Sequence, residues 1–207
     1  LETVLPTLFT ALGRVPDPDL ALNNLERFSQ KVIDRHFLLG LFRDHPRILH
    51  LALTIFGSSQ FLSDILVRQP QLFEWLLEPG VVHRPKSKEE LVEEARRVTA
   101  IASTPDRKWT ALRRHKSQEI LRIGIQDLVG RQNVVGITEE LSNLADVCLE
   151  VAYQFCRADL IRRHGAPQLA GEPGRPLECP FVILGMGKLG GRELNFGADI
   201  DLIFVYE

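Results

Sequence analysis

The chain has 207 residues, 44% hydrophobic and 25% charged, with a formal net charge of −2, a composition typical of globular proteins. This charge argues against non-specific binding of nucleic acid, and no apolar run approaches the roughly 20 residues that a helix needs to cross a bilayer. The three cysteines form no Cys-x-x-Cys pair, which favours a reducing, cytoplasmic setting.

Helical signals fill the first 170 residues. Apolar residues at helical spacing predict one helix over residues 20–34 and another over residues 46–56, the latter ended by Gly57. Ser58 or Ser59 can cap the next helix, because a hydroxyl oxygen accepts hydrogen bonds from the free amides of a first helical turn. The sequence therefore predicts a mainly helical region.

Two stronger start signals follow. Ser87 and Glu90 fit a capping box, in which each side chain accepts from the other residue's amide, and the helix that they begin should end near residue 103. Thr104-Pro105 predicts the start of a long helix. A last helix is predicted to begin at Thr138 and to present one apolar stripe.

The helix that begins at Thr104-Pro105 is strongly basic. Its positive side chains suit docking onto an acidic partner or a phosphate-bearing substrate. A solvated helix face explains them as well, because Asp106 and Glu119 partly offset the charge. The basic residues are Arg107, Lys108, Arg113, Arg114, Lys116 and Arg122.

The helical pattern breaks at residues 164–179, which hold three prolines and three glycines. That density cannot sustain a helix or a central strand, so we expect a linker or a surface loop there. After the break the periodicity becomes that of strands. We therefore predict an α+β fold with a boundary near residue 175, a helical region over residues 1–175 and the start of a second domain over residues 176–207.

Residues that can carry chemistry gather at the end of the sequence. A strand over residues 181–184 leads into a glycine turn at Gly185–Gly191, and a second strand is predicted to contain Asp199-Ile200-Asp201. Because strand side chains alternate, the two aspartates should share one face while Ile200 faces the core. Two carboxylates on one side of a strand need a compensating cation, which favours a divalent metal such as Mg²⁺.

The glycine turn matches a dinucleotide-binding fingerprint at Gly185, Gly187 and Gly190. However, the next strand begins only nine residues after Gly190, too soon for the crossover helix and acidic residue of a Rossmann fold. The six histidines show no His-x-x-x-His spacing, so metal binding by histidine is not expected.

A nucleotidyltransferase pattern of the DNA polymerase β type is a better template. Leu189-Gly190-Gly191 precedes Asp199-Ile200-Asp201 by seven residues, the spacing typical of that pattern. Glycines let backbone amides approach a phosphate closely, and Lys188 is a possible second phosphate contact, although a solvated lysine is equally consistent. Taken alone, the two aspartates would also fit a solvated edge strand or a turn cap.

The run GMGKLGGRELNFGADIDLIFVYE, residues 185–207, resembles the signature of the bifunctional glutamine-synthetase adenylyltransferase/adenylyl-removing family, in its amino-terminal copy. Residues 61–70 and 113–123 resemble the helical lead-in of that family. The resemblance implies a helical region followed by the start of a polymerase-β-like domain. It implies Mg²⁺ bound by Asp199 and Asp201, and nucleotide or phosphate contacts from Gly187, Lys188, Gly190 and Gly191.

The resemblance also implies an activity. Inorganic phosphate would remove AMP from a tyrosine of glutamine synthetase and release ADP, while a second domain would transfer AMP from ATP. The implied regulators are the PII nitrogen-signalling protein and glutamine. We expect a cytoplasmic, monomeric protein that binds neither nucleic acid nor membranes.

Two departures from the family pattern are visible. Ala198 stands where the family commonly has a serine, which puts a hydroxyl contact in doubt. The family completes its metal site with a third carboxylate on a later strand, and none follows here. From this, from the first residue Leu1 and from the strand before Glu207, we expect a fragment that is inactive alone. The remaining alternative is a helical interaction module without catalytic activity.

Overall fold

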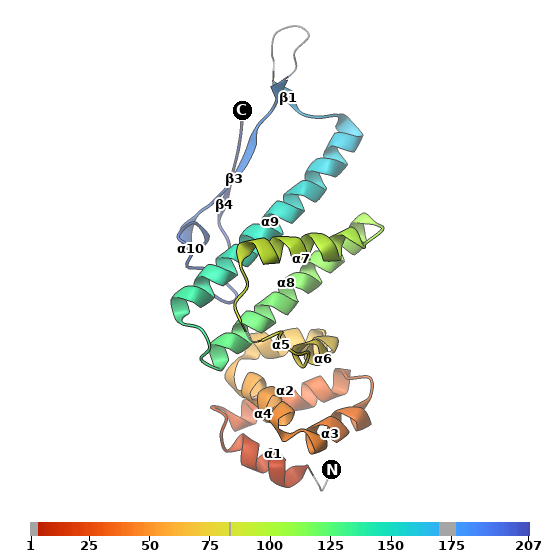
Figure 1. Ribbon diagram of the computed structural model, residues 1–207, viewed down its shortest axis with the longest axis vertical. Coiled ribbons are helices and arrows are strands. Elements are labelled where there is room, and N and C mark those ends of the chain that lie inside the picture. Colours follow the sequence, from red (N-terminus) through yellow and green to blue (C-terminus); the bar gives the residue numbers. More distant parts are fainter. Residues whose placement is uncertain (1–3, 83, 170–176) are drawn as a thin grey trace. The chain divides into compact units, whose positions relative to one another are not determined.

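The computed structural model describes residues 4–82, 84–169 and 177–207 (Figure 1). Helices dominate these residues and the strands form antiparallel pairs, which confirms the predicted α+β class. The elements are α1 (Leu5–Leu12), α2 (Pro18–Lys31), α3 (Arg35–Asp44), α4 (Pro46–Ser58), α5 (Gln60–Arg68), α6 (Gln71–Leu76), α7 (Lys88–Ala100), α8 (Pro105–Leu128), α9 (Val134–His164), β1 (Gln168–Leu169), β2 (Leu177–Glu178), β3 (Phe181–Gly185), α10 (Gly187–Gly190) and β4 (Leu202–Tyr206).

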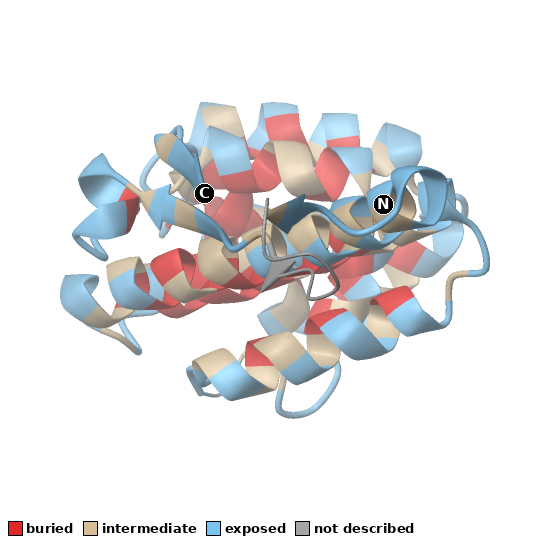
Figure 2. Ribbon diagram, turned by 90° about the horizontal axis from the view of Figure 1, so that it is seen from above, coloured by how far each residue is buried: buried red, intermediate tan, exposed pale blue. Residues whose placement is uncertain are grey.

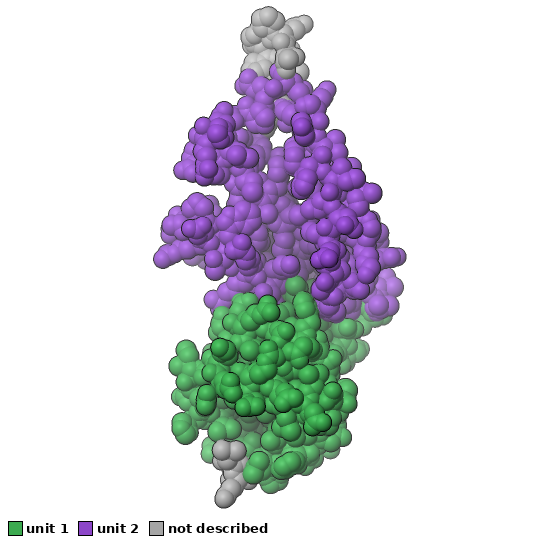
Figure 3. All heavy atoms as spheres, turned by 180° about the vertical axis from the view of Figure 1, so that it is seen from behind, with its two compact units in different colours: residues 1–84, 120–133 green, residues 85–119, 134–207 purple. Residues whose placement is uncertain are grey.

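The chain divides into two compact units, which Figure 3 colours separately. Unit 1 comprises Leu1–Arg84 and Ile120–Asn133, and unit 2 comprises Pro85–Glu119 and Val134–Glu207. The helix α8 therefore begins in unit 2 and ends in unit 1. In this division α7 and α9 belong to the same unit as the strands, and the domain boundary near residue 175 stays a prediction.

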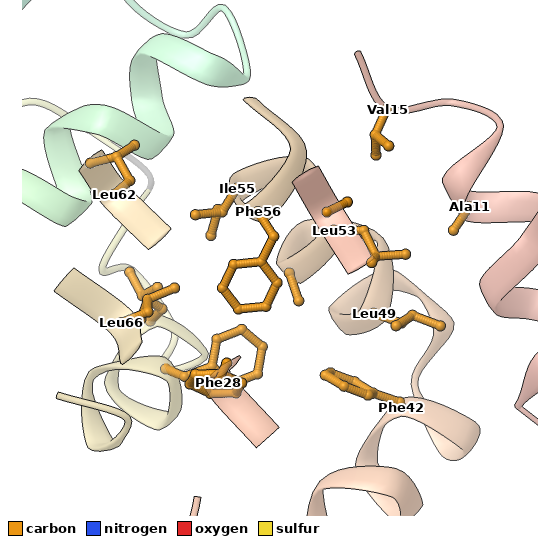
Figure 4. Close-up of a cluster of buried hydrophobic side chains, with 14 of the residues drawn as sticks. Ala11, Val15, Phe28, Phe42, Leu49, Leu53, Ile55, Phe56, Leu62 and Leu66 are labelled. Carbon is orange, nitrogen blue, oxygen red and sulfur yellow. The ribbon is translucent and has the colours of Figure 1, made fainter. Parts of the chain in front are cut away.

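Aromatic and aliphatic side chains build the core of unit 1 (Figure 4). The ring centre of Phe28 lies 5.4 Å from those of both Phe56 and Phe73. Burying one such side chain contributes about 1.5–3 kcal/mol, and tilted rings add to this through their quadrupoles. The buried Asn24 is compatible with this core because its Nδ2 donates to the carbonyl of Phe56 at 3.1 Å.

Gly57 does not end a helix, as the sequence suggested, but lies inside α4, which continues to Ser58. A Cβ atom on Gly57 would come 2.9 Å from the carbonyl oxygen of Asp17. The close approach of the loop before α2 therefore requires this glycine. Ser59 then caps α5, since its Oγ accepts from the amide of Leu62, and this confirms the predicted cap.

Residues 121–126 of α8 are all buried, whereas the strand pair β3–β4 is largely exposed (Figure 2). Among the residues described, no single helix is long and apolar enough to span a bilayer. The helices α4 and α5 reach that measure only as a pair, and the chain bends by 120° between them.

In unit 2, α7 packs on α9 through buried residues that include Leu91 and Val147. The predicted capping box of α7 is confirmed: the Ser87 hydroxyl accepts from the Glu90 amide, and the Glu90 carboxylate accepts from the Ser87 amide. The start of α9 was predicted wrongly. The helix begins at Val134, directly after Asn133, and asparagine is a residue type favoured at helix N-caps. Thr138 lies inside the helix, and its hydroxyl donates to the carbonyl of Val135.

The strands β3 and β4 run antiparallel, with Phe181 opposite Tyr206 and Gly185 opposite Leu202. A dinucleotide-binding fold needs parallel strands joined by a full crossover helix, so the Rossmann alternative is wrong. The short strands β1 and β2 also pair antiparallel. They flank residues 170–176, so the central part of the predicted loop over residues 164–179 lies outside the described residues.

Candidate functional site

The glycine turn between β3 and β4 is tightly folded. β3 ends at Gly185, and α10 follows as a single turn over Gly187–Gly190. A Cβ atom on Gly190 would come 2.5 Å from the carbonyl oxygen of Gly185, closer than any real side chain could lie. Gly187 has a φ of 52°, in the left-handed region that favours glycine. Glycines at 187 and 190 are therefore required by the turn itself.

The amides of this turn are arranged differently from the sequence expectation. Those of Gly190 and Gly191 donate to the carbonyls of Met186 and Gly187, at 3.1 and 2.9 Å. They are thus engaged within the helical turn. In a first helical turn the amides without an acceptor are the initial ones, here those of Gly187 and Lys188. The absence of a side chain at Gly190 instead allows its backbone to approach that of Gly185 closely.

The two aspartates lie directly before β4 and not inside it. The strand begins only at Leu202, because its pairing partner β3 ends at Gly185 and the chain turns away there. Ile200 is 39% exposed and does not face the core, so that part of the prediction was wrong. Both aspartates are exposed, and neither carboxylate has an ion pair or hydrogen bond with any described residue.

One of the aspartates meets the glycine turn. The Oδ2 atom of Asp201 lies 3.2 Å from the position that a Cβ atom would take on Gly187. The backbone is fixed at the same place, since the amide of Met186 donates to the carbonyl of Asp201 at 2.9 Å. The structure therefore brings a predicted metal ligand against the predicted phosphate turn.

The loop between α10 and β4 is anchored on α9. The buried amide of Leu194 donates to Ser142 Oγ at 3.2 Å. Arg192, with a φ of 58°, donates to the side chain of Asn143 and pairs with Glu139 at 3.7 Å. Sequence reasoning missed these residues. They lie some 50 positions upstream, on a helix face that carries no local signal of this contact.

Lys188 also joins the loop, since its Nζ donates to Asn195 Oδ1 at 3.4 Å. Beside the turn, unit 2 has a hollow of about 520 Å³, in the size range of small-molecule sites. Lys88 and Asp146 pair across part of its rim at 2.7 Å. Other lining residues are Tyr153, Phe181, Gly185 and Leu189.

A second group of possible metal ligands lies elsewhere in unit 2. Glu94, His115 and Glu119 have ligand atoms within 4.8 Å of one another. Lys86 Nζ donates to Glu94 at 2.6 Å and to Glu119 at 2.9 Å. Because this ammonium already compensates the carboxylates, we interpret the group as a charge network that holds α7 and α8 together. It does not include Asp199 or Asp201.

The basic residues of α8 are not all exposed. Arg122 is fully buried and donates to the carbonyl of Arg84 at 3.3 Å and to Gln126 at 3.2 Å. It belongs to the interior of unit 1 and not to a docking face, which corrects the sequence-based grouping. Arg107, Arg113, Arg114 and Lys116 are exposed, whereas Lys108 lies over the ring of Phe155 at 5.5 Å.

A family model described as glutamate-ammonia ligase adenylyltransferase matches residues 49–207. Curated relatives match the chain over its length, and each is named bifunctional glutamine synthetase adenylyltransferase/adenylyl-removing enzyme. The relative from Pseudomonas aeruginosa is 30% identical over 209 residues, which is all of this chain and 21% of the relative. The relative from Nocardia farcinica is 31% identical over 99% of this chain and 20% of the relative. The relative from Thioalkalivibrio sulfidiphilus is 29% identical over 100% of this chain and 21% of the relative. The chain thus spans about a fifth of the length of these relatives.

Proposed function

The chain belongs to the glutamate-ammonia ligase adenylyltransferase family, and we propose that it supplies part of a nucleotidyltransferase site that removes AMP from glutamine synthetase. The observation that carries this proposal is the contact between Asp201 and the glycine turn at Gly187. It joins a carboxylate pair to a phosphate-binding type of turn. We further propose that the chain works within a longer protein, as its relatives do.

The aspartates fit Mg²⁺. Asp199 and Asp201 offer exposed carboxylate oxygens, the ligands that Mg²⁺ prefers, and no described residue neutralises them. When bound, the ion would neutralise charge on the phosphates and help to activate the attacking oxygen. The family pattern implies a third carboxylate, but among the described residues none forms a metal-binding group with this pair. The third ligand stays a prediction.

The remaining roles follow from the turn. The first amides of α10, on Gly187 and Lys188, can donate to phosphate oxygens, and Gly190 and Gly191 let the backbone approach closely. The Lys188 ammonium is a further phosphate contact that would have to leave Asn195. These groups would orient an inorganic phosphate for attack on the phosphorus of the AMP–tyrosine bond. A new P–O bond forms, the bond to the tyrosine oxygen breaks, and that oxygen takes a proton, giving ADP and free tyrosine.

The proposed partners are those of the whole enzyme. Glutamine synthetase is the substrate protein, ADP and inorganic phosphate are ligands of this site, and ATP serves a second domain. The PII protein and glutamine would act as regulators in the cytoplasm. The names of the relatives combine adenylyl transfer with adenylyl removal, which supports the pairing of two opposed activities in one protein.

The test uses the longer protein that we propose contains this chain. Asp199→Asn with Asp201→Asn removes the negative charges and keeps the side-chain size. We expect phosphate-dependent ADP release from adenylylated glutamine synthetase to fall by at least about 100-fold, because metal-assisted stabilisation contributes several kcal/mol. The matched control is Asp19→Asn with Asp127→Asn, two exposed aspartates outside the site, which should leave the rate unchanged.

The other outcomes separate the alternatives. If the Asp199/Asp201 variant keeps phosphorolysis but loses AMP transfer from ATP, the chain belongs to the opposite activity. If both activities persist, the aspartates are not catalytic. The chain would then be a helical interaction module, which is the alternative that the sequence left open.

A further inference from the structure

Arginines without a partner are concentrated in one part of unit 2. Elsewhere, exposed arginines are often paired, as Arg27 is with Asp64 at 2.8 Å and Arg43 with Asp44 at 2.7 Å. Five arginines on α7 and the first half of α8 have neither an ion pair nor a side-chain hydrogen bond with any described residue. This α7–α8 arginine surface consists of Arg96, Arg97, Arg107, Arg113 and Arg114.

The local charge is high. Residues 96–118 contain seven lysines and arginines and one acidic residue, Asp106, although the whole chain carries a net charge of −2. The next acidic residue, Glu119, is buried and paired with Lys86 at 2.9 Å. It cannot neutralise the exposed arginines. The segment over residues 96–118 therefore carries a positive excess.

A hollow of about 500 Å³ is lined by two of these arginines, Arg107 and Arg114. Arg107 and Arg114 line it from the same side of α8, since seven residues make two helical turns and separate them by about 10 Å along the axis. Thr110 and Gln118 also line the hollow, and so does Asp106, the one acidic residue of the segment over residues 96–118. The lining comprises Val98, Asp106, Arg107, Thr110, Ala111, Arg114 and Gln118.

We propose that the α7–α8 arginine surface is a docking site for an acidic segment of a partner protein. Guanidinium groups bind carboxylates through two parallel hydrogen bonds, and five arginines without partners leave that capacity unused. Their spread over two turns of α8 and the end of α7 matches several carboxylates along a chain better than a single phosphate group. The proposal does not depend on the activity of the Asp199–Asp201 site.

Binding is measured by fluorescence anisotropy with the 207-residue chain and a fluorescein-labelled peptide of 20 glutamates. We expect saturable binding that weakens as salt is raised, because exposed charges are screened. Arg107→Glu with Arg114→Glu should weaken it by about tenfold, since each substitution replaces an attraction by a repulsion. The control, Arg14→Glu with Arg47→Glu, changes the net charge equally at two other exposed, unpaired arginines and should change affinity less than twofold.

Several results would overturn the proposal. One is the absence of binding by the unaltered chain at 50 mM salt, and another is an equal loss in both charge-reversal variants. A third is tighter binding of inorganic phosphate or ADP than of the peptide with the same dependence on Arg107 and Arg114, which would identify a phosphate site instead. Circular dichroism of both variants checks the fold, and Arg107→Lys with Arg114→Lys should retain part of the affinity because charge remains but the paired geometry is lost.

Discussion

A single missing side chain explains how the aspartates and the glycine turn come together. At Gly187, any Cβ atom would stand 3.2 Å from Asp201 Oδ2, and the φ of 52° would strain any other residue type. The glycine thus leaves room for the carboxylate at the start of α10. The same residue presents one of the turn's first amides, so the predicted metal ligand and a predicted phosphate-binding amide meet at one position.

Cys148 gives a prediction at the residue scale. Burial raises the pKa of its thiol to about 11, although the nearby charge of Lys116 acts in the opposite direction. The reactive thiolate is the deprotonated form, so at pH 8 Cys148 should carry about 100-fold less thiolate than a cysteine with its ordinary pKa of 9.0. We expect Cys156, which is exposed, to react with iodoacetamide far faster.

The measurement compares variants that keep only Cys148 or only Cys156, with the other cysteines changed to serine. The labelling rate of Cys148 should continue to rise up to pH 10 or above, and at pH 8 it should be far below that of the exposed Cys156. Equal rates at pH 8 would show that Cys148 is accessible and that burial does not control its pKa.

At the scale of elements, the α9 helix positions the loop that leads to the aspartates. In Ser142→Ala the buried amide of Leu194 loses its acceptor, which costs about 1–3 kcal/mol when the donor stays buried. We expect this amide to exchange with solvent about 10- to 100-fold faster, measured by hydrogen exchange with NMR detection. Ser142→Thr keeps the hydroxyl and should restore protection. Unchanged exchange in the alanine variant would show that Ser142 does not hold the loop.

Signals confined to a few neighbouring residues predicted the elements best. The Ser87–Glu90 box and the Ser59 cap need only one helical turn, and both were confirmed. The role of Gly57 was misread, because it depends on a contact with Asp17, some 40 residues away in the sequence. A glycine that ends a helix and a glycine that allows close contact inside a helix both follow an apolar run, so the sequence does not distinguish them.

The candidate site shows the same limit. Its residue types and spacing were visible in the sequence, and their roles remain a prediction. Which amides are free, and where β4 begins, depend on the pairing of β3 with β4 and could not be derived from Asp199–Asp201 alone. The anchoring of the loop by Ser142 depends on a contact between distant segments, for which one sequence holds no signal.

At the scale of the whole molecule, each compact unit contains one tryptophan. Trp75 packs against the core of unit 1, and Trp109 packs edge-on against Phe155 in unit 2, with ring centres 5.7 Å apart. A Trp75→Phe background therefore leaves Trp109 as a fluorescent reporter of unit 2. The stability of the two units can then be followed separately in the intact chain.

The charge network around Lys86 is the feature of unit 2 to test with this reporter. Lys86 Nζ joins Glu94 on α7 to Glu119 on α8, and its amide donates to Glu140 on α9 at 2.7 Å. Removing one partner from a buried ion pair typically costs about 3–5 kcal/mol. Lys86→Met should therefore lower the urea midpoint of the Trp109 transition substantially.

Two further substitutions show whether Lys86 stabilises unit 2 by its charge or only by its packing, because the two cases shift the urea midpoint in opposite directions. Adding Glu94→Gln and Glu119→Gln to Lys86→Met removes the two carboxylate charges that Lys86 contacts, while the side-chain volumes stay nearly the same. The triple variant should therefore be more stable than Lys86→Met alone. If Lys86 acted only by filling space, the two further substitutions would add their own losses and the midpoint would fall again. A recovery in unit 2, with the Trp75 transition unchanged in a Trp109→Phe background, would show that this network stabilises one unit by neutralising the carboxylates of Glu94 and Glu119.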